Sequence, residues 1–365
     1  MKRITFFILS LASGGAEHQL CILANLLQEK GYKVSITTFG EADDHYRLDP
    51  TIERVVLGKG LSKWRKLVII FKHFKNLDSD VVIGFGARYN CFMLFPLLFN
   101  KKRILKIAGE RCAWFGRYPW YESVNLKFLY KTADYIVPNS YAQTQQILRV
   151  RPEYTPKTIT ITNYTDTSKY QVAQLPNNEI IRIGIFCRYE KQKNFHRFIE
   201  VIKQLKDEGY TAFHVDWYGD LHLRNPILQQ YIEDGKALIK QYKVGDLITL
   251  NDKTKKVDEL LPTFDVLCLP SLFEGFSNSI SEYICCGRPV LCSDVADNSV
   301  MVRNCENGYL FNPLDVYSMV NAFKNFFALS IEERKHKAAR SREIAEELFK
   351  KEKFVESYIN LIESK

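Results

Sequence analysis

The feature of this sequence that most limits its fold is an alternation of short apolar segments with helical patterns. In the first half, helical patterns at Ala16–Glu29 and Leu61–Leu77 fall between apolar segments. Those apolar segments predict strands at Ile4–Leu9, Lys33–Thr38, Ile52–Val56, Val81–Phe85, Ile104–Ala108 and Tyr135–Pro138. Short buried strands separated by helices are typical of a parallel sheet that helices cover on both faces.

The alternation restarts after a polar stretch, Leu175–Glu179, which we interpret as a linker. Strands are predicted at Ile180–Phe186, Phe213–Tyr218, Ile248–Leu250, Val266–Leu269, Pro289–Cys292 and Tyr309–Phe311, and helices at Phe195–Glu208 and Ser279–Cys286. A charged helical segment, Ser330–Glu363, opens with the pattern of a capping box. The chain of 365 residues is long enough for two domains.

We therefore expect an α/β protein with two doubly wound, Rossmann-like domains that face each other across a cleft. The expected domains are residues 1–174 and 175–345, followed by a C-terminal helix over 346–365 that returns to the first domain. Ligands of such sheets bind at the carboxyl ends of the strands.

Positive charge is concentrated in the first half. Residues 1–170 contain 25 Lys and Arg against 14 Asp and Glu, a net charge of +11, whereas the whole chain carries +9. This predicts an anionic partner for the first half: a membrane surface or a phosphate-bearing acceptor. Nucleic acid is not expected, because no zinc-finger, RNA-recognition or basic-zipper pattern accompanies the charge.

Cysteine usage and hydropathy favour a cytoplasmic protein. The nine cysteines contain no Cys-x-x-Cys pair, which is typical of reduced thiols. Lys2-Arg3 and the apolar residues after them resemble a short signal peptide, but we interpret Ile4–Leu9 as the first strand. The longest apolar run, Cys91–Phe99, is too short to span a membrane. Peripheral binding to the inner face of the cell membrane stays open.

The window Leu272–Arg288 carries the clearest chemistry. Glu274 lies in a loop after the strand Val266–Leu269, and a helix capped by Ser277 follows. The amide groups at the start of a helix favour an anion such as a pyrophosphate. Glu282 lies one turn inside this helix, which we expect to end at Gly287 before Pro289.

This window resembles the donor signature of glycosyltransferase family 4, whose members are retaining enzymes of the GT-B fold. The resemblance rests on Glu274 and Glu282 with seven residues between them, and on Gly275, Phe276, Gly287 and Pro289 in register. It extends to members that build lipid-linked oligosaccharides, capsule and O-antigen, and it covers nearly the whole chain, most clearly from Arg182 to Leu310.

The resemblance implies roles for these residues. Glu274 would bind the donor sugar and act in catalysis, and Glu282 would bind the ribose hydroxyls. The remaining donor-binding positions of this half would be Gly275, Phe276, Ser277, Asn278, Ser279, Ile280 and Gly219.

A second element follows the strand Ile180–Phe186. Arg188 and, five residues on, Lys193 resemble the pair with which the family neutralises the departing diphosphate, and both are therefore expected to be catalytic. Cys187 stands where the family has glycine, and Lys191 is an alternative to Lys193.

Two loops of the first half resemble the family's remaining site segments. Gly14 and Gly15, in the segment Ser13–His18, are expected to approach the donor phosphate, and His18 to face the acceptor. Glu110 and Arg111 resemble an acceptor-side Ser-Glu-Arg segment, although a structural ion pair is the alternative.

The function implied is transfer of a hexose or N-acetylhexosamine from a nucleotide diphosphate sugar, with uridine as the expected base, to a glycan linked to polyprenyl diphosphate. No metal or cofactor is expected, because Asp43 and Asp44 are adjacent and lack the carboxylate-x-carboxylate spacing of metal-dependent transferases. An anionic membrane is a further candidate partner, since the helix Leu61–Leu77 is amphipathic and basic. A non-catalytic partner of another transferase and a nucleotide-sugar epimerase stay open.

Overall fold

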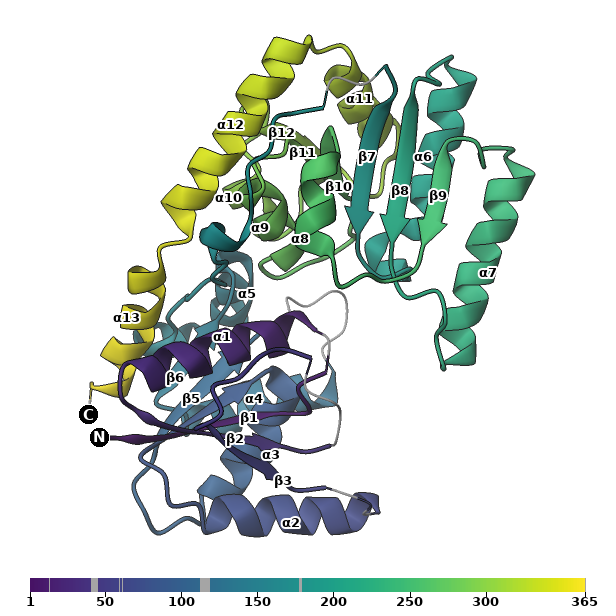
Figure 1. Cartoon of the computed structure of the whole chain (residues 1–365). Helices are drawn as coiled ribbons and strands as arrows, with labels where there is room; N and C mark the ends of the chain where they lie inside the picture. Colours follow the sequence, from purple (N-terminus) through teal and green to yellow (C-terminus); the bar gives the residue numbers. More distant parts are fainter. Residues whose placement is uncertain are drawn as a thin grey trace. The chain divides into compact units, whose positions relative to one another are not determined.

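The computed structural model describes residues 1–12, 14–40, 45–58, 60, 62–111, 119–176 and 179–364. Ser13, Asp43 and Asp44, which the sequence analysis used, lie outside these ranges. The chain divides into two compact units, Met1–Tyr164 with Lys351–Lys365, and Thr165–Lys350 (Figure 1).

The first unit is built on a parallel sheet of six strands in the order β3-β2-β1-β4-β5-β6. Its strands are β1 (Arg3–Ile8), β2 (Lys33–Thr38), β3 (Glu53–Val56), β4 (Val81–Phe85), β5 (Leu105–Glu110) and β6 (Tyr135–Pro138). Its helices are α1 (Gly15–Glu29), α2 (Lys63–Lys75), α3 (Ala87–Leu97), α4 (Trp120–Lys127), α5 (Tyr141–Val150) and α13 (Lys351–Ile362).

The second unit repeats this design with a parallel sheet in the order β12-β11-β10-β7-β8-β9. Its strands are β7 (Ile181–Phe186), β8 (Phe213–Tyr218), β9 (Ile248–Asn251), β10 (Val266–Leu269), β11 (Val290–Ser293) and β12 (Gly308–Phe311). Its helices are α6 (Phe195–Asp207), α7 (Pro226–Gln241), α8 (Val257–Leu260), α9 (Asn278–Cys285), α10 (Asn298–Met301), α11 (Val316–Phe327) and α12 (Ile331–Leu348).

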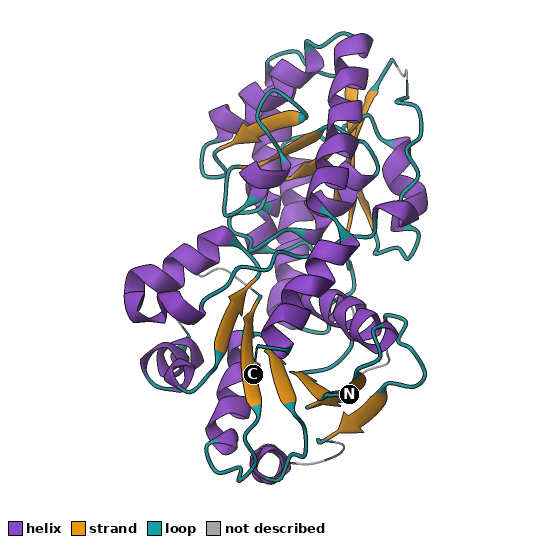
Figure 2. Ribbon diagram, turned by 90° about the vertical axis from the view of Figure 1, so that its left-hand side faces the viewer, coloured by secondary structure: helices purple, strands orange, loops and turns teal. Residues whose placement is uncertain are grey.

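Helices cover the sheet of each unit, which confirms the predicted fold class (Figure 2). Central strands such as β4 and β10 are buried along their whole length, which is why the sequence shows them as unbroken apolar runs. Each unit has its own core, centred on Phe7, Phe74 and Tyr130 in the first and on Phe198 and Trp217 in the second.

The apolar run Cys91–Phe99, which carried no predicted element, lies mostly in α3. Helices α2 and α4 both contact α3 and cover part of this run, whereas Phe95 and Phe99 are about half exposed. The predicted segment Ser330–Glu363 is two helices, α12 and α13, with the capping box confirmed at Ser330 and Glu333. Within the described ranges, no helix combines the length and the apolar character needed to cross a bilayer.

The boundary between the units falls after Tyr164, before the expected linker. Residues 165–174 group with the second unit because side chains of that unit hold their backbone. Arg288 Nη2 donates to the carbonyl oxygens of Ala173 (3.1 Å) and Gln174 (3.2 Å), and Arg342 Nη1 donates to that of Thr167 (3.0 Å). The amino-acid composition of this segment does not indicate these contacts, because they come from residues far away in the chain. The last segment, Lys351–Lys365, groups with the first unit.

Candidate active site

The candidate site of the second unit lies where its strand order reverses. Strands β7 and β10 are neighbours in the sheet, and the helices after them lie on opposite faces in a doubly wound fold. The loop after β7 carries Arg188 and Lys193, and the loop after β10 carries Glu274. Because these strands are adjacent and parallel, their loops lie close together. Lys193 and Glu274, which are 81 residues apart in the chain, therefore come into contact.

Lys193 and Glu274 form a largely buried ion pair in this place. Lys193 Nζ donates to Glu274 Oε1 at 2.5 Å, and the two side chains are 12% and 10% exposed. Burial lowers the pKa of Lys193, but the charge of Glu274, the nearby Cys187 and the hydrogen bond to Glu274 together outweigh burial, so the pKa is raised. Lys193 is therefore a fixed positive charge at the carboxyl edge of the sheet, with little water to screen it.

Backbone contacts hold the two loops in register. Leu272 N donates to the carbonyl oxygen of Gln192 (2.7 Å), and Gln192 Nε2 donates to that of Phe273 (3.0 Å). Asn194 follows in the left-handed conformation (φ +61°), which asparagine tolerates better than most residues, and its side chain donates to Pro313 O (2.7 Å). This turn directs Lys193 inward, while Lys191 is exposed.

Arg188 occupies the open side of the same loop. It is largely exposed and pairs with Glu190 at 3.0 Å, so its guanidinium group can reorient toward a ligand at small cost. Cys187 stands in place of the family's glycine without backbone strain, because it is not among the described residues with positive φ. Its carbonyl oxygen accepts from Trp217 Nε1 (2.9 Å).

Helix α9 begins next to this pair. Ser277 caps it as predicted: its side chain accepts from the amide of Ile280 (3.4 Å). The Ile280 amide is therefore occupied by the cap. As in any helix, the amides of the first turn, which includes Asn278 and Ser279, point toward the N-terminal end of α9.

The residues around this turn are buried or already engaged in contacts. Phe276 is buried and packs edge-on against Phe349 (6.3 Å between centroids), and Gly275 is also buried. The Ser279 hydroxyl donates to Phe186 O (3.2 Å). Any contribution of Phe276 to a ligand would therefore come from its backbone.

Glu282 lies on the next turn of α9, where a residue missed by the sequence analysis contacts it. The side chain of Tyr170, in the segment that leads into the second unit, hydrogen-bonds the Glu282 carboxylate. Burial raises the pKa of Glu282 to about 7, and the Tyr170 hydrogen bond opposes that shift. Burial also raises the pKa of Tyr170, which keeps its hydroxyl protonated as the donor. No sequence signal marks Tyr170, since it precedes the strand pattern and belongs to no motif.

A prediction follows for Tyr170→Phe. Losing the hydroxyl removes the interaction that lowers the pKa of Glu282, so more of this carboxyl is protonated near neutral pH. A protonated carboxyl accepts hydrogen bonds poorly, and we expect nucleotide diphosphate binding to weaken several-fold at about pH 7 and to recover toward about pH 9. Titration calorimetry with UDP across this range measures the effect. Tyr317→Phe, at an exposed position of the same unit, is the control; an identical pH profile for Tyr170→Phe and Tyr317→Phe would contradict the prediction.

The carboxyl end of α9 is fixed by Gly287 and Arg342. Arg342 Nη1 donates to the carbonyl oxygens of Cys285 (2.7 Å) and Tyr170 (3.3 Å), which ties Tyr170 to the helix that carries Glu282. Gly287 has φ +62°, as predicted for a glycine that ends a helix. A Cβ atom at this position would lie 3.1 Å from Val172 Cγ1.

We expect Gly287→Ala to lower the free energy of unfolding by about 1–2 kcal/mol, because an L-residue is strained in the left-handed region. Chemical denaturation measures it. Gly245→Ala, where the nearest atom to the added Cβ is 3.8 Å away and φ is not positive, should be close to neutral. Equal stability of the two variants would show that Gly287 is not required by its conformation.

Close packing requires a glycine at position 219, directly after β8. A Cβ atom there would lie 2.7 Å from Cys187 O and 2.9 Å from the Tyr189 ring. The glycine lets Tyr189 pack beneath the loop that carries Arg188 and Lys193.

In the first unit, Gly14 is the N-cap of α1 and Gly15 is its first residue. Gly14 N donates to the Tyr46 hydroxyl (3.3 Å), and His18 stacks on the Tyr46 ring at 4.6 Å. A Cβ at Gly14 would clash with the Glu17 carboxylate at 2.2 Å, so the side chain of Glu17 covers this glycine.

Glu110 and Arg111 are both engaged within the first unit. The Glu110 carboxylate is 1% exposed and accepts from Asn90 Nδ2 and Gln143 Nε2, both at 3.3 Å. Burial, and then the charge of Glu122, raise the pKa of Glu110 well above its usual value. Arg111 lies over the Phe85 ring (3.8 Å) and donates to the Tyr358 hydroxyl (2.7 Å). In this structure the Glu110 side chain is closed to a ligand, whereas Arg111 is only partly buried.

Comparison with known proteins assigns the chain to an enzyme class. Residues 179–328, which include Arg188, Lys193, Glu274 and Glu282, match the family described as glycosyl transferases group 1. Over 313 residues the chain is 25% identical to a Campylobacter jejuni N-acetylgalactosamine-N,N'-diacetylbacillosaminyl-diphospho-undecaprenol 4-alpha-N-acetylgalactosaminyltransferase, covering 80% of this chain and 81% of the relative. The protein is a glycosyltransferase.

Two further comparisons support this glycosyltransferase assignment and its fold. Over 296 residues, 77% of this chain and 76% of the relative, the chain is 24% identical to a second Campylobacter jejuni protein. That protein is named for alpha-1,4-N-acetyl-D-galactosaminyl transfer to a GalNAc–GalNAc–diNAcBac glycan on undecaprenol diphosphate. The structure of this chain matches that of HepE from Anabaena, solved with UDP and glucose, with a TM-score of 0.85 over the full length of both chains at 17% identity. The glycosyltransferase therefore has the GT-B fold.

Proposed function

We propose that this glycosyltransferase moves a hexose or N-acetylhexosamine from a UDP-sugar to a glycan carried on polyprenyl diphosphate, with retention at the anomeric carbon. The observation that carries the proposal is the buried Lys193–Glu274 pair beside the N-terminus of α9, with Glu282 one turn further along that helix. Both Campylobacter relatives are named for undecaprenol-diphosphate-linked acceptors, which supports the acceptor class.

The chemistry of each residue suits a separate part of the donor. Lys193 and Arg188 supply positive charge where the diphosphate leaves, and the first-turn amides of α9 add hydrogen-bond donors. Glu274 accepts from the sugar hydroxyls while it holds Lys193, and Glu282 accepts from the ribose hydroxyls. In this proposal the departing phosphate takes the proton of the incoming hydroxyl, so no protein nucleophile and no metal ion is required.

A donor panel tests the proposal. The purified enzyme is incubated with UDP- and GDP-linked sugars and a short lipid-diphosphate disaccharide, and the product is examined by mass spectrometry and NMR. Transfer from a UDP-sugar with an α-linked product supports the proposal, whereas an inverted linkage would overturn the retaining mechanism. Interconversion of the donor without transfer would favour the epimerase, and nucleotide binding without either reaction would favour a non-catalytic partner.

We also propose that α2 contacts an anionic membrane. Its exposed Trp64 and Val68 lie among Arg65, Lys66, Lys72 and Lys75, a combination typical of helices at a lipid surface. Co-sedimentation with vesicles of phosphatidylglycerol should fall as salt is raised or as a neutral lipid replaces the anionic one. Binding that changes neither with salt nor with the charge of the lipid would overturn the proposed electrostatic contact.

A further inference from the structure

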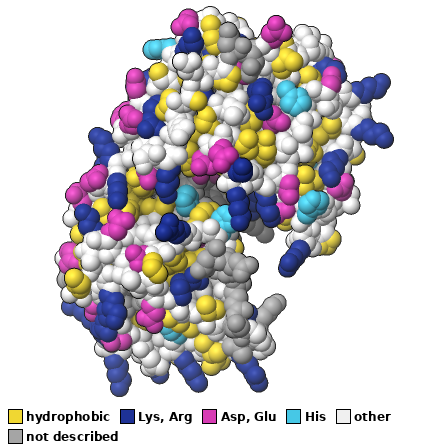
Figure 3. Space-filling model, in the orientation of Figure 1, with side chains coloured by type: hydrophobic (Ala, Val, Ile, Leu, Met, Phe, Trp, Pro, Cys, Tyr) yellow, Lys and Arg dark blue, Asp and Glu magenta, His cyan; other side chains and the backbone are white. Residues whose placement is uncertain are grey.

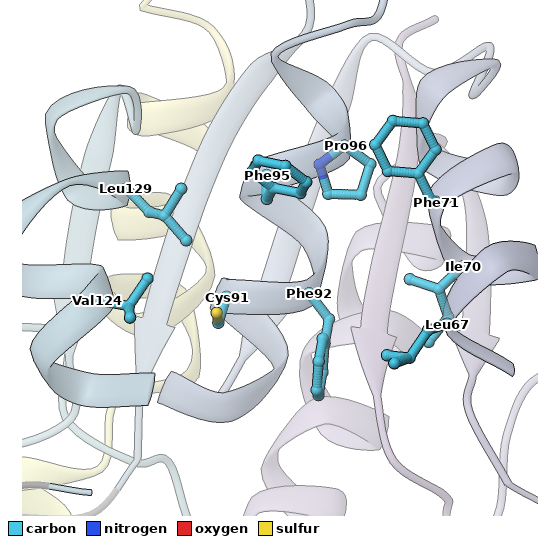
Figure 4. A pocket seen from close by; sticks show the side chains of 9 residues that line it. All are labelled: Leu67, Ile70, Phe71, Cys91, Phe92, Phe95, Pro96, Val124 and Leu129. Atoms are coloured by element: carbon cyan, nitrogen blue, oxygen red, sulfur yellow. The ribbon is translucent and has the colours of Figure 1, made fainter. Parts of the chain in front are cut away.

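The first unit contains an apolar cavity that the donor site does not use. It has a volume of about 330 Å³ and lies over α3, between α2 and the segment that runs from α4 to Leu129. Figure 4 shows Leu67 and Phe71 of α2 on one side of it, Cys91 and Phe95 of α3 in the middle, and Val124 and Leu129 on the other. Every side chain that lines it is apolar, so the cavity favours a hydrocarbon over a sugar or a nucleotide.

The position of the cavity connects it with the ligand-binding edge of the sheet. Helices α2, α3 and α4 follow strands β3, β4 and β5, so each begins at the carboxyl edge, where ligands of parallel sheets bind. Leu67, Cys91 and Val124 are each four residues from the first residue of their helix. At 1.5 Å per residue the near end of the cavity is about 6 Å along the helix axes from that edge.

An exposed apolar surface continues from the cavity. The rings of Phe71, Phe95 and Phe99 contact one another with centroids 5.5 to 6.0 Å apart, and Phe95 and Phe99 are each about half exposed. A second hollow shares Leu67 and Phe71 and is also lined by Trp64, which is 80% exposed. The cavity, the three phenylalanine rings and the second hollow together form one continuous apolar surface, here called the track. It is larger than the surface that a single side chain would cover.

The charge around this track suits an anionic head group. Helix α2, which lines the cavity and the second hollow, has five Lys and Arg and no acidic residue. Lys72 and Lys75 line the second hollow, and Lys and Arg side chains gather along the lower edge of the face in Figure 3, where α2 lies.

We infer that this cavity binds the aliphatic chain of the lipid-linked acceptor, with the basic residues of the track facing its phosphates. The inference rests on the proposed function for the identity of the lipid, but not for the existence of the site. A hydrocarbon chain fits an apolar cavity of this volume, whereas the flat face of a bilayer does not enter one. Binding here would hold the lipid close to the carboxyl edge, where its diphosphate and glycan continue toward the reaction.

The binding test uses alkyl phosphates in free solution. Dodecyl phosphate below its micelle concentration, butyl phosphate and inorganic phosphate are titrated into the full-length protein by calorimetry. We expect dodecyl phosphate to bind at least about tenfold more tightly than butyl phosphate, because its additional methylene groups are buried. Equal affinity of the two, or vesicle binding without dodecyl phosphate binding, would overturn the inference.

Variants locate the site. Cys91→Trp fills the cavity and should abolish the preference for dodecyl phosphate, whereas Val150→Trp on α5, at an exposed position of the same unit, should keep it. Leu67→Gln, at a position 38% exposed, places an amide at the cavity and provides the test if Cys91→Trp does not fold. Unchanged dodecyl phosphate binding in the folded variants would overturn the assignment.

A kinetic test separates this inference from the proposed function. Two acceptors share one glycan diphosphate and differ in carrying a long or a short isoprenoid. We expect a lower KM for the long-chain acceptor, and loss of that difference in Leu67→Gln with kcat on the short-chain acceptor unchanged. Equal KM values in the wild type would overturn the inference, whereas failure to use either acceptor would count against the proposed function and leave the alkyl phosphate result to decide the cavity.

Discussion

Replacing Lys193 by methionine is expected to lower kcat by on the order of 10²- to 10³-fold, the usual effect of removing one donor that stabilises charge in a transition state. Lys193 is largely buried and fixed by Glu274, so in the proposed reaction its charge would act on the departing diphosphate with little screening. Lys191→Met is the matched control, because Lys191 lies in the same turn but is exposed. Initial rates with a saturating UDP-sugar measure both. A larger loss in Lys191→Met than in Lys193→Met would assign the role to Lys191.

The stability of the Lys193 variants distinguishes a structural pair from a catalytic one. Lys193→Met leaves Glu274 buried without its cation, which should destabilise the fold by about 3–5 kcal/mol. The double variant Lys193→Met/Glu274→Gln has no buried charge at this place and should regain much of that free energy of unfolding. The double variant should nevertheless remain inactive. If the double variant recovered activity together with stability, the pair would be structural only.

Replacing Glu282 by alanine is expected to abolish turnover with the fold intact, through loss of donor binding. A carboxylate that accepts from two ribose hydroxyls contributes about 1.5–3 kcal/mol for each hydrogen bond, so the Kd for UDP should rise on the order of 10²-fold or more. Calorimetry with UDP measures the affinity, and thermal unfolding checks the fold. Glu259→Ala removes an exposed carboxylate of the same unit and serves as the control. Unchanged UDP affinity in Glu282→Ala would refute the donor assignment.

The pKa of Glu282 adds a pH dependence to that prediction. Because the pKa is raised to about 7, the carboxyl is protonated below that pH and ionised above it. Donor binding by the wild type should therefore weaken as the pH falls through about 7, while the weak binding of Glu282→Ala should stay level over the same range. A flat profile for the wild type would show that this carboxyl does not bind the ribose.

Local features of the site were predictable because they depend on residues close together in the chain. Ser277 caps α9 three residues before the amide it accepts from, and Gly287 ends the helix because its conformation suits glycine. The strands were predictable because β4 and β10 are buried on both faces and appear as continuous apolar runs. The family resemblance rested on the same short window around Glu274 and Glu282.

Contacts between distant segments were not predictable in this way. The sequence left Lys191 and Lys193 as alternatives, and the left-handed turn at Asn194 together with the pairing of β7 and β10 places Lys193 against Glu274. Tyr170 carries no motif, and it meets Glu282 because Arg342 of α12 holds the backbone of its segment against α9.

By itself, the sequence determined the two parallel sheets, the limits of helix α9 and the acids at its start, since apolar periodicity and capping are properties of neighbouring residues. Only the tertiary structure decided which lysine is buried, which tyrosine contacts Glu282, and that three helices line an apolar cavity. Each of these depends on which strands and helices become neighbours in space. The packing of whole layers determines which elements become neighbours, so these contacts cannot be predicted from any short stretch of the chain.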